Sequence, residues 1–200
     1  LLRNGEAVGN YWAPIYKGMD TSGNPIYEDI DGGGVDINSI GDRRIVGNDY
    51  PDFEMGWQNS LSYKKFFFTF SFRAVVGQSL LNWDRLSYEN LRPLASGFNI
   101  LSSTLDHPEY KSEIAYDSRF VDKASYAKLD NLVFGYDFKL GPNQLKLYVS
   151  GNNLLTMTKF KGNDPEHIIP GFNTDTEKFG GDNLTYPYSR TFLLGIKFNF

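Results

Sequence analysis

The sequence predicts an all-β protein, an antiparallel β-barrel that spans a membrane. Three observations support this fold class. Apolar and polar residues alternate over segments long enough to cross a bilayer. The connections between those segments alternate between very short and very long. The composition, with 16% aromatic residues, 20 glycines and no cysteine, favours strands and turns over helices.

The clearest strand covers residues 66–77, where six apolar side chains fall on one face and mostly polar ones on the other. The six are Phe66, Phe68, Phe70, Phe72, Ala74 and Val76. The chain end repeats the alternation over residues 191–200. Soluble strands usually have about five or six residues, whereas a tilted membrane-crossing strand needs about nine to eleven. Both segments have the membrane-crossing length.

Four further strands are expected, over residues 53–63, 131–138 and 145–152 and, on a weaker pattern, over residues 7–17. This makes about six strands, fewer than the roughly eight of the smallest bacterial barrels, so the rest of the barrel is expected to come from residues outside this chain. A soluble antiparallel domain of long strands is the alternative. It would have to shield the row of phenylalanines inside a protein core.

The connections indicate how the strands run. Residues 63–65 and 141–143 form tight turns, whereas residues 20–51, 78–123 and 155–186 form long polar connections. Outer-membrane barrels have short turns on the periplasmic side and long loops outside. If the C-terminus lies in the periplasm, the last strand descends, and both tight turns then fall on the periplasmic side. The predicted location is the bacterial outer membrane.

Several function classes are excluded. The net charge is −4 without a basic run, so the chain lacks the electrostatic footprint of a nucleic-acid-binding protein. The absence of cysteine excludes disulfides, thiolate metal sites and a cysteine nucleophile. His107 and His167 lie in expected loops without a nucleophile at a telling spacing, and the Gly-x-Ser-x-Gly motif of hydrolases is absent. The protein is therefore not expected to be an enzyme.

Spaced blocks along nearly the whole chain resemble the SusC/RagA family of TonB-dependent transporters. They are residues 41–48 (GDRRIVGN) with Pro51, Phe53, Gly56 and Asn59, then residues 117–121 (DSRFV) with residues 124–126, then residues 150–156 (SGNNLLT), and finally residues 186–187, 190–191 and Gly195. The resemblance implies a barrel of roughly 22 strands, of which residues 1–200 would supply about the last six. The signal peptide, the plug domain and the earlier strands would lie outside this chain.

The resemblance also implies a function and partners. Such a protein would import an oligosaccharide or a peptide together with a SusD-like surface lipoprotein that acts as a lid. TonB would act on it through the N-terminal region, and outer-membrane lipid and the remaining barrel and plug would surround this chain. A passive porin or an adhesin-type barrel is the alternative, since it would share the strands without TonB dependence.

Two sets of loop residues are candidate sites. Asp29, Asp31 and Asp36 surround three consecutive glycines and offer oxygen ligands of the kind that Ca²⁺ accepts, although Ile40 stands where an EF-hand would have its bidentate glutamate. No other cofactor is expected. Aromatic side chains in the long loops could pack on a substrate. They are Trp83, Tyr88, Phe98, Tyr110, Phe160, Phe172 and Phe179.

The last strand carries a third candidate function. Its apolar face ends in an aromatic residue at the C-terminus and resembles the signal that the barrel-insertion machinery reads. This face consists of Phe192, Leu194, Ile196, Phe198 and Phe200. A strand that merely faces lipid would look the same, and the two interpretations are compatible.

Overall fold

The computed structural model describes residues 3–107, 110, 115–166, 181–182 and 188–200. The chain forms two compact units. Residues 52–76, 125–159 and 187–200 form the strand unit, and residues 1–51, 77–124 and 160–186 form the loop unit, which contains most of each long connection between the strands.

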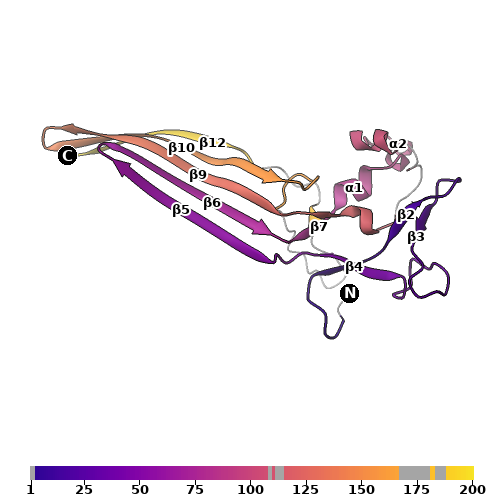
Figure 1. The fold of residues 1–200 in the computed structure, drawn as a ribbon. Helices are drawn as coiled ribbons and strands as arrows, with labels where there is room; N and C mark the ends of the chain where they lie inside the picture. Colours follow the sequence, from indigo (N-terminus) through magenta and orange to yellow (C-terminus); the bar gives the residue numbers. More distant parts are fainter. Residues whose placement is uncertain (1–2, 108–109, 111–114, 167–180, 183–187) are drawn as a thin grey trace. The chain divides into compact units, whose positions relative to one another are not determined.

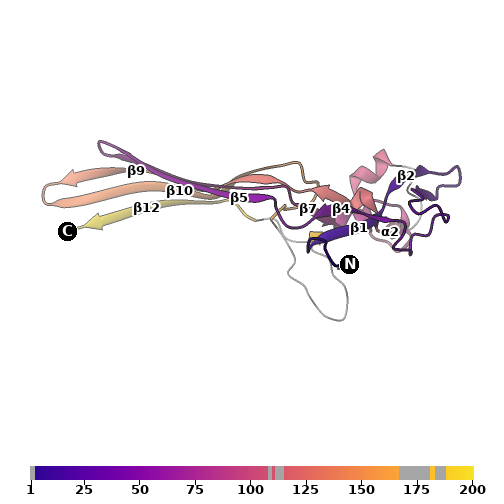
Figure 2. The same cartoon turned by 60° about the horizontal axis from the view of Figure 1, so that its bottom comes forward.

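The strand unit is one antiparallel sheet of five strands (Figure 1). In spatial order the strands are β12 (Thr191–Asn199), β10 (Asn143–Thr158), β9 (Tyr126–Leu140), β6 (Phe66–Val76) and β5 (Phe53–Tyr63). They have between 9 and 16 residues, as a membrane-crossing strand requires. Figure 2 shows the neighbouring strands β9, β10 and β12 side by side.

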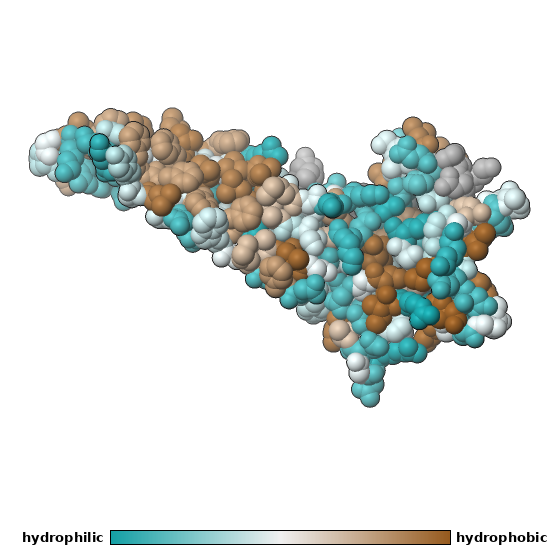
Figure 3. All heavy atoms as spheres, in the orientation of Figure 1, coloured by the Kyte–Doolittle hydropathy of each residue, from teal (hydrophilic) through white to brown (hydrophobic). Residues whose placement is uncertain are grey.

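The register gives this sheet one apolar and one largely polar face. Phe68 on β6 pairs with Leu61 on β5 and with Phe134 on β9. Leu147 on β10 pairs with Tyr136 on β9 and Ile196 on β12. Directly paired residues project to the same side of a sheet, so the apolar sets of all five strands share one face. Brown and tan atoms cover much of the sheet in Figure 3.

Both tight turns are present. Tyr63 pairs with Phe66, so two residues turn the chain, and Lys64 adopts a φ of 58°. Gly141, with a φ of 64°, turns the chain between β9 and β10. Two-residue hairpins need such left-handed backbone because it matches the twist of the flanking strands. The expected hairpins are therefore confirmed.

The loop unit contains short strands and short helices. Two antiparallel pairs are β1 (Asn10–Pro14) with β4 (Arg43–Asn48) and β2 (Tyr16–Met19) with β3 (Pro25–Tyr27). A three-stranded sheet places β7 (Ser79–Asn82) between β8 (Val121–Lys123) and β11 (Gly181–Asp182). The helices are α1 (Trp83–Tyr88), α2 (Arg92–Ala95) and the 3₁₀ turns η1 (Ser102–Asp106) and η2 (Ser118–Phe120). Among the described residues, none forms a helix long and apolar enough to cross a membrane.

The prediction of a strand over residues 7–17 is wrong in detail. This segment divides into β1 and the start of β2, and neither belongs to the five-stranded sheet. All five residues of β1 are buried, on both faces of the strand, and β1 pairs with β4 in the loop unit. Its tyrosine and tryptophan thus fill a protein core instead of facing lipid.

The loop unit has two small hydrophobic clusters. The larger packs Tyr11 of β1 and Leu81 of β7 against Tyr110 and Phe120. The smaller joins Leu80, Ala124 and Phe160. Each cluster joins residues that are far apart in the sequence, so the described parts of the long connections pack against one another.

Candidate functional site

Much of the apolar face of the strand unit is exposed. Trp57 is 55% exposed, Leu194 76% and Ile196 69%. Soluble proteins rarely expose an apolar surface that runs unbroken over five long strands. A sheet with one continuous apolar face and one polar face is typical of a barrel wall between lipid and a wet lumen.

Aromatic rings gather on this face near the two tight turns. The ring centroid of Phe66 lies 4.7 Å from that of Tyr136, and the Tyr136 ring lies 4.5 Å from that of Phe138. Phe198 and Phe200 pack against one another at 6.1 Å. Outer-membrane barrels carry such aromatic girdles at the membrane–water interfaces, where a ring can contact both lipid and polar groups.

The opposite face carries charges that pair across strands. Arg73 on β6 donates from Nε and Nη2 to the two carboxylate oxygens of Asp130 on β9, at 2.9 and 3.0 Å. Lys146 on β10 approaches Asp137 on β9 to 3.4 Å. Paired charges of this kind suit a water-filled lumen and would be costly in hydrocarbon.

An alternating row of aromatic and glycine residues crosses the same face. In register, Phe67 of β6 pairs with Gly135 of β9, Gly135 pairs with Tyr148 of β10, and Tyr148 pairs with Gly195 of β12. A Cβ at Gly135 would collide with the Phe67 ring, and one at Gly195 with the Tyr148 ring. The rings thus lie over the glycines, and the ammonium of Lys146 lies 4.2 Å from the centre of the Phe67 ring.

A buried ion pair organises the loop unit. The Asp117 carboxylate is fully buried and accepts a hydrogen bond from Nε of Arg119 at 3.0 Å and another from the hydroxyl of Tyr27 at 3.1 Å. The Arg119 guanidinium lies 3.8 Å from the ring centre of Tyr16 and 4.9 Å from that of Tyr110. These five residues, called the arginine hub below, join the β2–β3 hairpin to Tyr110 and to residues 117–119.

Burial and charge act together on the arginine hub. Burial alone would lower the pKa of the Arg119 guanidinium, but the Asp117 carboxylate outweighs it and the pKa is raised. Burial, followed by the nearby Asp117 charge, raises the pKa of the Tyr27 hydroxyl. Arg119 therefore stays charged and Tyr27 neutral, as the hydrogen bonds require. The hub is therefore a structural element of the loop unit.

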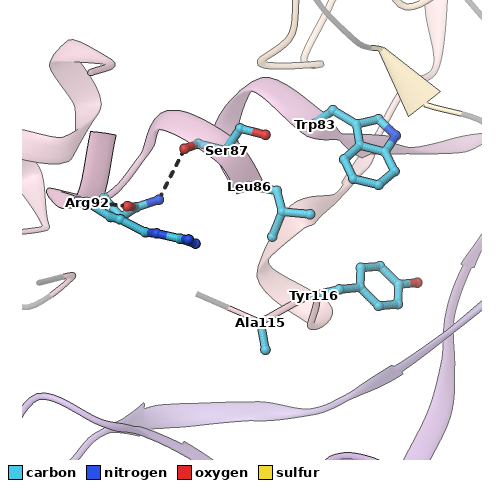
Figure 4. A pocket seen from close by; sticks show the side chains of 7 residues that line it. Trp83, Leu86, Ser87, Arg92, Ala115 and Tyr116 are labelled. Carbon is cyan, nitrogen blue, oxygen red and sulfur yellow. Dashed lines mark hydrogen bonds between the residues drawn. The ribbon is translucent and has the colours of Figure 1, made fainter. Parts of the chain in front are cut away.

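A cavity of about 670 Å³ opens beside α1 in the loop unit. The described residues that line it are Trp83, Leu86, Ser87, Asn90, Arg92, Ala115 and Tyr116. Figure 4 shows Trp83 and Tyr116 on one side of the cavity and the side chain of Arg92 on the other. A volume of this size is within the range of small-molecule sites.

The candidate substrate-contact residues lie in different surroundings, and only some of them are exposed or line the cavity. Trp83 lines the cavity, and Phe98 is exposed. Tyr110 and Phe160 are buried in the two hydrophobic clusters, so they act as core residues. Tyr88 lies at the end of α1 outside the cavity lining. Phe172 and Phe179 lie outside the described residues.

The acidic loop also differs from the expectation. The carboxylates that come together, within 4.8 Å of one another, are those of Asp29, Asp31 and Asp42, whereas Asp36 accepts the backbone N–H of Asn38. Each of the three already accepts backbone N–H groups, for example those of Ile30 and Asp36 on Asp42. These hydrogen bonds lower the pKa of Asp42. The cluster thus closes the loop around residues 29–42.

Sequence reasoning missed the arginine hub and most of the cavity. It noted residues 117–121 only as part of a resemblance, although an aspartate two residues before an arginine is a usable signal for a local ion pair. It identified Trp83 but not Asn90, Arg92 or Tyr116, because the order of residues along the chain gives no sign that they line one space.

Comparisons with known proteins are consistent with this geometry. TonB-dependent receptor P3 of Formosa agariphila is 34% identical over 100% of this chain, which spans 23% of that protein. TonB-dependent receptor SusC of Bacteroides thetaiotaomicron is 29% identical over 98% of this chain, which spans 20% of that protein. The chain thus spans less than a quarter of the length of each of these two relatives. No protein-family model matches the chain.

Solved structures give the same result for the fold. The RagAB peptide importer in its open-open state matches 100% of this chain and 24% of its own, with a TM-score of 0.74 and 23% identity. The closed-closed state of that importer matches with a TM-score of 0.71. The expected fold class, part of a membrane β-barrel, is confirmed. The relatives are transporters and receptors, not enzymes.

Proposed function

Because the chain belongs to the SusC/RagA family of TonB-dependent outer-membrane transporters, we propose that it forms part of a transporter that actively imports a bulky nutrient, either an oligosaccharide or a peptide. The observation that carries the proposal is the apolar face of five long strands, much of it exposed, opposite a face of paired charges. Such a sheet is stable when lipid covers one side and a polar lumen the other.

The proposed orientation puts the C-terminus and both tight turns in the periplasm. By the order of strands along the chain, the long connections would then run on the outer side and offer surface to the nutrient and to a SusD-like lipoprotein that covers the transporter. The plug, the earlier strands and the segment that contacts TonB would belong to the part of the transporter beyond residues 1–200, which supply the C-terminal part of the barrel. Transport energy would come from the proton gradient of the inner membrane through TonB.

The test is uptake by whole cells. We would express the full-length parent gene with its neighbouring SusD-like gene and measure uptake of labelled oligosaccharides and peptides, with and without the proton gradient. Gradient-dependent uptake of one class is expected. Uptake that continues after the gradient is collapsed would instead make the protein a passive pore, and failure to take up either class in the presence of the gradient would contradict import of these nutrients.

A further inference from the structure

We propose that Lys64 and Lys65, in the tight turn between β5 and β6, bind the phosphate of an anionic phospholipid. They belong to the turn end of the strand unit, which consists of residues 61–68, 134–149 and 194–200. Figure 1 shows both hairpin turns at this end of the sheet. The inference rests on the orientation proposed above, which puts the turn end at the periplasmic leaflet, and it goes beyond nutrient import.

A row of aromatic rings crosses the apolar face at the turn end. Tyr63 of β5 pairs with Phe66 of β6, and Phe66 pairs with Tyr136 of β9. The ring centroids of Phe66 and Tyr136 are 4.7 Å apart, and Tyr63 is 70% exposed. Aromatic rings at a membrane–water interface contact acyl chains on one side and headgroups on the other. The row therefore marks the depth at which lipid phosphates begin.

The side chains of both lysines reach back to this row. The ammonium of Lys64 lies 5.3 Å from the ring centre of Tyr63, and the ammonium of Lys65 lies 5.9 Å from that of Tyr136. The backbone of the turn is fixed, because the Lys65 carbonyl accepts the backbone N–H of Asp137 at 2.8 Å. A long lysine side chain can cover an apolar surface while its charge stays at the polar boundary. Both charges thus lie beside the rings, where a headgroup would be.

The charge of the two lysines is not neutralised by the described part of the chain. Neither Lys64 nor Lys65 takes part in an ion pair there. The residues of the turn end include five lysines but one acidic residue, Asp137, which Lys146 approaches to 3.4 Å. The whole chain has the opposite balance, with 20 basic and 24 acidic residues. The positive charge is therefore local to the turn end, and basic residues at a membrane surface attract anionic lipids.

An anionic phospholipid matches both parts of this surface. Its acyl chains would cover the exposed rings, and its phosphate would lie between the ammonium groups. Free phosphate would leave the rings uncovered. A zwitterionic headgroup such as that of phosphatidylethanolamine carries its own ammonium, which cancels the charge of its phosphate. A lysine is a flexible point charge with three rotatable donors, so it suits a mobile headgroup that presents no fixed geometry.

The test is lysine acetylation in the full-length transporter. The protein is placed in nanodiscs of phosphatidylcholine with a rising fraction of phosphatidylglycerol, and an uncharged reagent acetylates its lysines. Mass spectrometry of peptides then gives the rate at each lysine. A bound phosphate protects an ammonium, so we expect Lys64 and Lys65 to react about fivefold more slowly when phosphatidylglycerol is abundant. Lys139 is the internal control and should keep its rate, because it is exposed and pairs with Gln144 on the polar face.

A second measurement uses variants. Native mass spectrometry of the detergent-purified protein counts the phosphatidylglycerol molecules that stay bound. The double variant Lys64→Gln with Lys65→Gln should retain fewer of them than the unmodified protein. Lys139→Gln removes a lysine from the same end of the sheet and should retain as many. Tyr63→Ala should reduce the protection of Lys64 from acetylation, because the lysine loses the ring beside which it lies.

Several outcomes would overturn the proposal. They are unchanged rates at Lys64 and Lys65, equal slowing at Lys139, the same protection by phosphatidylethanolamine, and the same protection by inorganic phosphate added to phosphatidylcholine nanodiscs. Equal retention of phosphatidylglycerol by the double variant would also contradict it. Gradient-dependent uptake without lipid protection would leave nutrient import standing while the lipid site fails. Lipid protection in a protein that imports neither nutrient class would leave the lipid site standing while import fails.

Discussion

The ring of Tyr148 on β10 lies over Gly195 on β12, its direct cross-strand partner, and leaves no room there for a Cβ. Phe67 on β6 stands in the same relationship to Gly135 on β9. In both pairs a large flat side chain covers the backbone of a glycine, which has no side chain, on the neighbouring strand. This fixes the register, because a slip of one residue would put each ring opposite a side chain.

We expect Gly195→Ala to destabilise the barrel. The added methyl group would have to displace the Tyr148 ring, and overpacking of this kind costs typically about 1–3 kcal/mol. The measurement is the urea midpoint of the full-length protein in detergent. Gly56→Ala in β5 is the matched control, since a Cβ there would meet open space. An equal loss in both variants would show that the aromatic cover has no special role.

We expect a single substitution in the arginine hub to lower the stability of the loop unit strongly. Arg119→Gln would leave the fully buried Asp117 carboxylate without its counter-charge, and breaking a buried ion pair in this way costs roughly 3–5 kcal/mol. We expect faster limited proteolysis between residues 77 and 124 of the full-length protein. Lys17→Gln breaks the exposed pair with Glu28 and should change little, because surface pairs contribute about 0–1 kcal/mol. Equal protection of Arg119→Gln and the unmodified protein would contradict the role given to the hub.

We expect a charged substitution of the C-terminal aromatic residue to impair assembly of the barrel. Phe200 is fully exposed and shares the apolar face of β12 with Phe198 and Ile196. Phe200→Asp puts a charge on that face, so we expect a lower amount of heat-modifiable barrel in the outer membrane. Asn199→Asp adds the same charge on the polar face and should have little effect. If Phe200→Asp reaches normal levels, the terminal residue is not part of an insertion signal.

We expect the acidic loop around residues 29–42 to lose structure at low pH. The pKa of Asp42 is lowered by the backbone N–H groups of Asp36 and Ile30, so it is lower in the folded chain than in the unfolded chain. The stabilisation is therefore complete above about pH 4, the ordinary range of an aspartate, and is lost as the pH falls through the lowered folded value. Hydrogen exchange of residues 29–42, corrected for intrinsic rates, should show this loss. Asp42→Ala should show faster exchange of residues 29–42 at every pH. Asp20 caps a different turn, so Asp20→Ala should leave the exchange of residues 29–42 unchanged.

The sequence predicted the strand unit because the lipid boundary forces alternation on every strand that crosses it. It located β5 and β6 closely but shortened β9 and β10. Register shifts explain the difference: the pairing of β9 shifts opposite Ser71 and Phe72, and β10 shifts between Asn152 and Leu155. In β9 the apolar residues change from even to odd positions across the shift, from Leu132 to Leu129, so a period of two cannot be followed there. In β10 the apolar residues keep odd positions on both sides, and the shift interrupts only the pairing.

The loop unit could not be predicted in the same way. The four residues of β7 are all buried, so the strand has no alternation to detect. The cavity depends on Trp83 and Tyr116 coming together, and the arginine hub on Tyr16, Tyr27 and Tyr110 reaching Arg119. Such contacts between distant segments follow from the tertiary fold and leave no local pattern.

The backbone N–H of Tyr16 also donates to the Ser118 hydroxyl across 102 residues of sequence. With the arginine hub, this bond makes the segments of residues 16–27 and 117–119 mutually dependent. A segment taken from a relative in place of one of these two would lack its partners. Recombination that keeps the loop unit folded must therefore transfer the two segments as a set, and single positions within the set change most readily by point substitution.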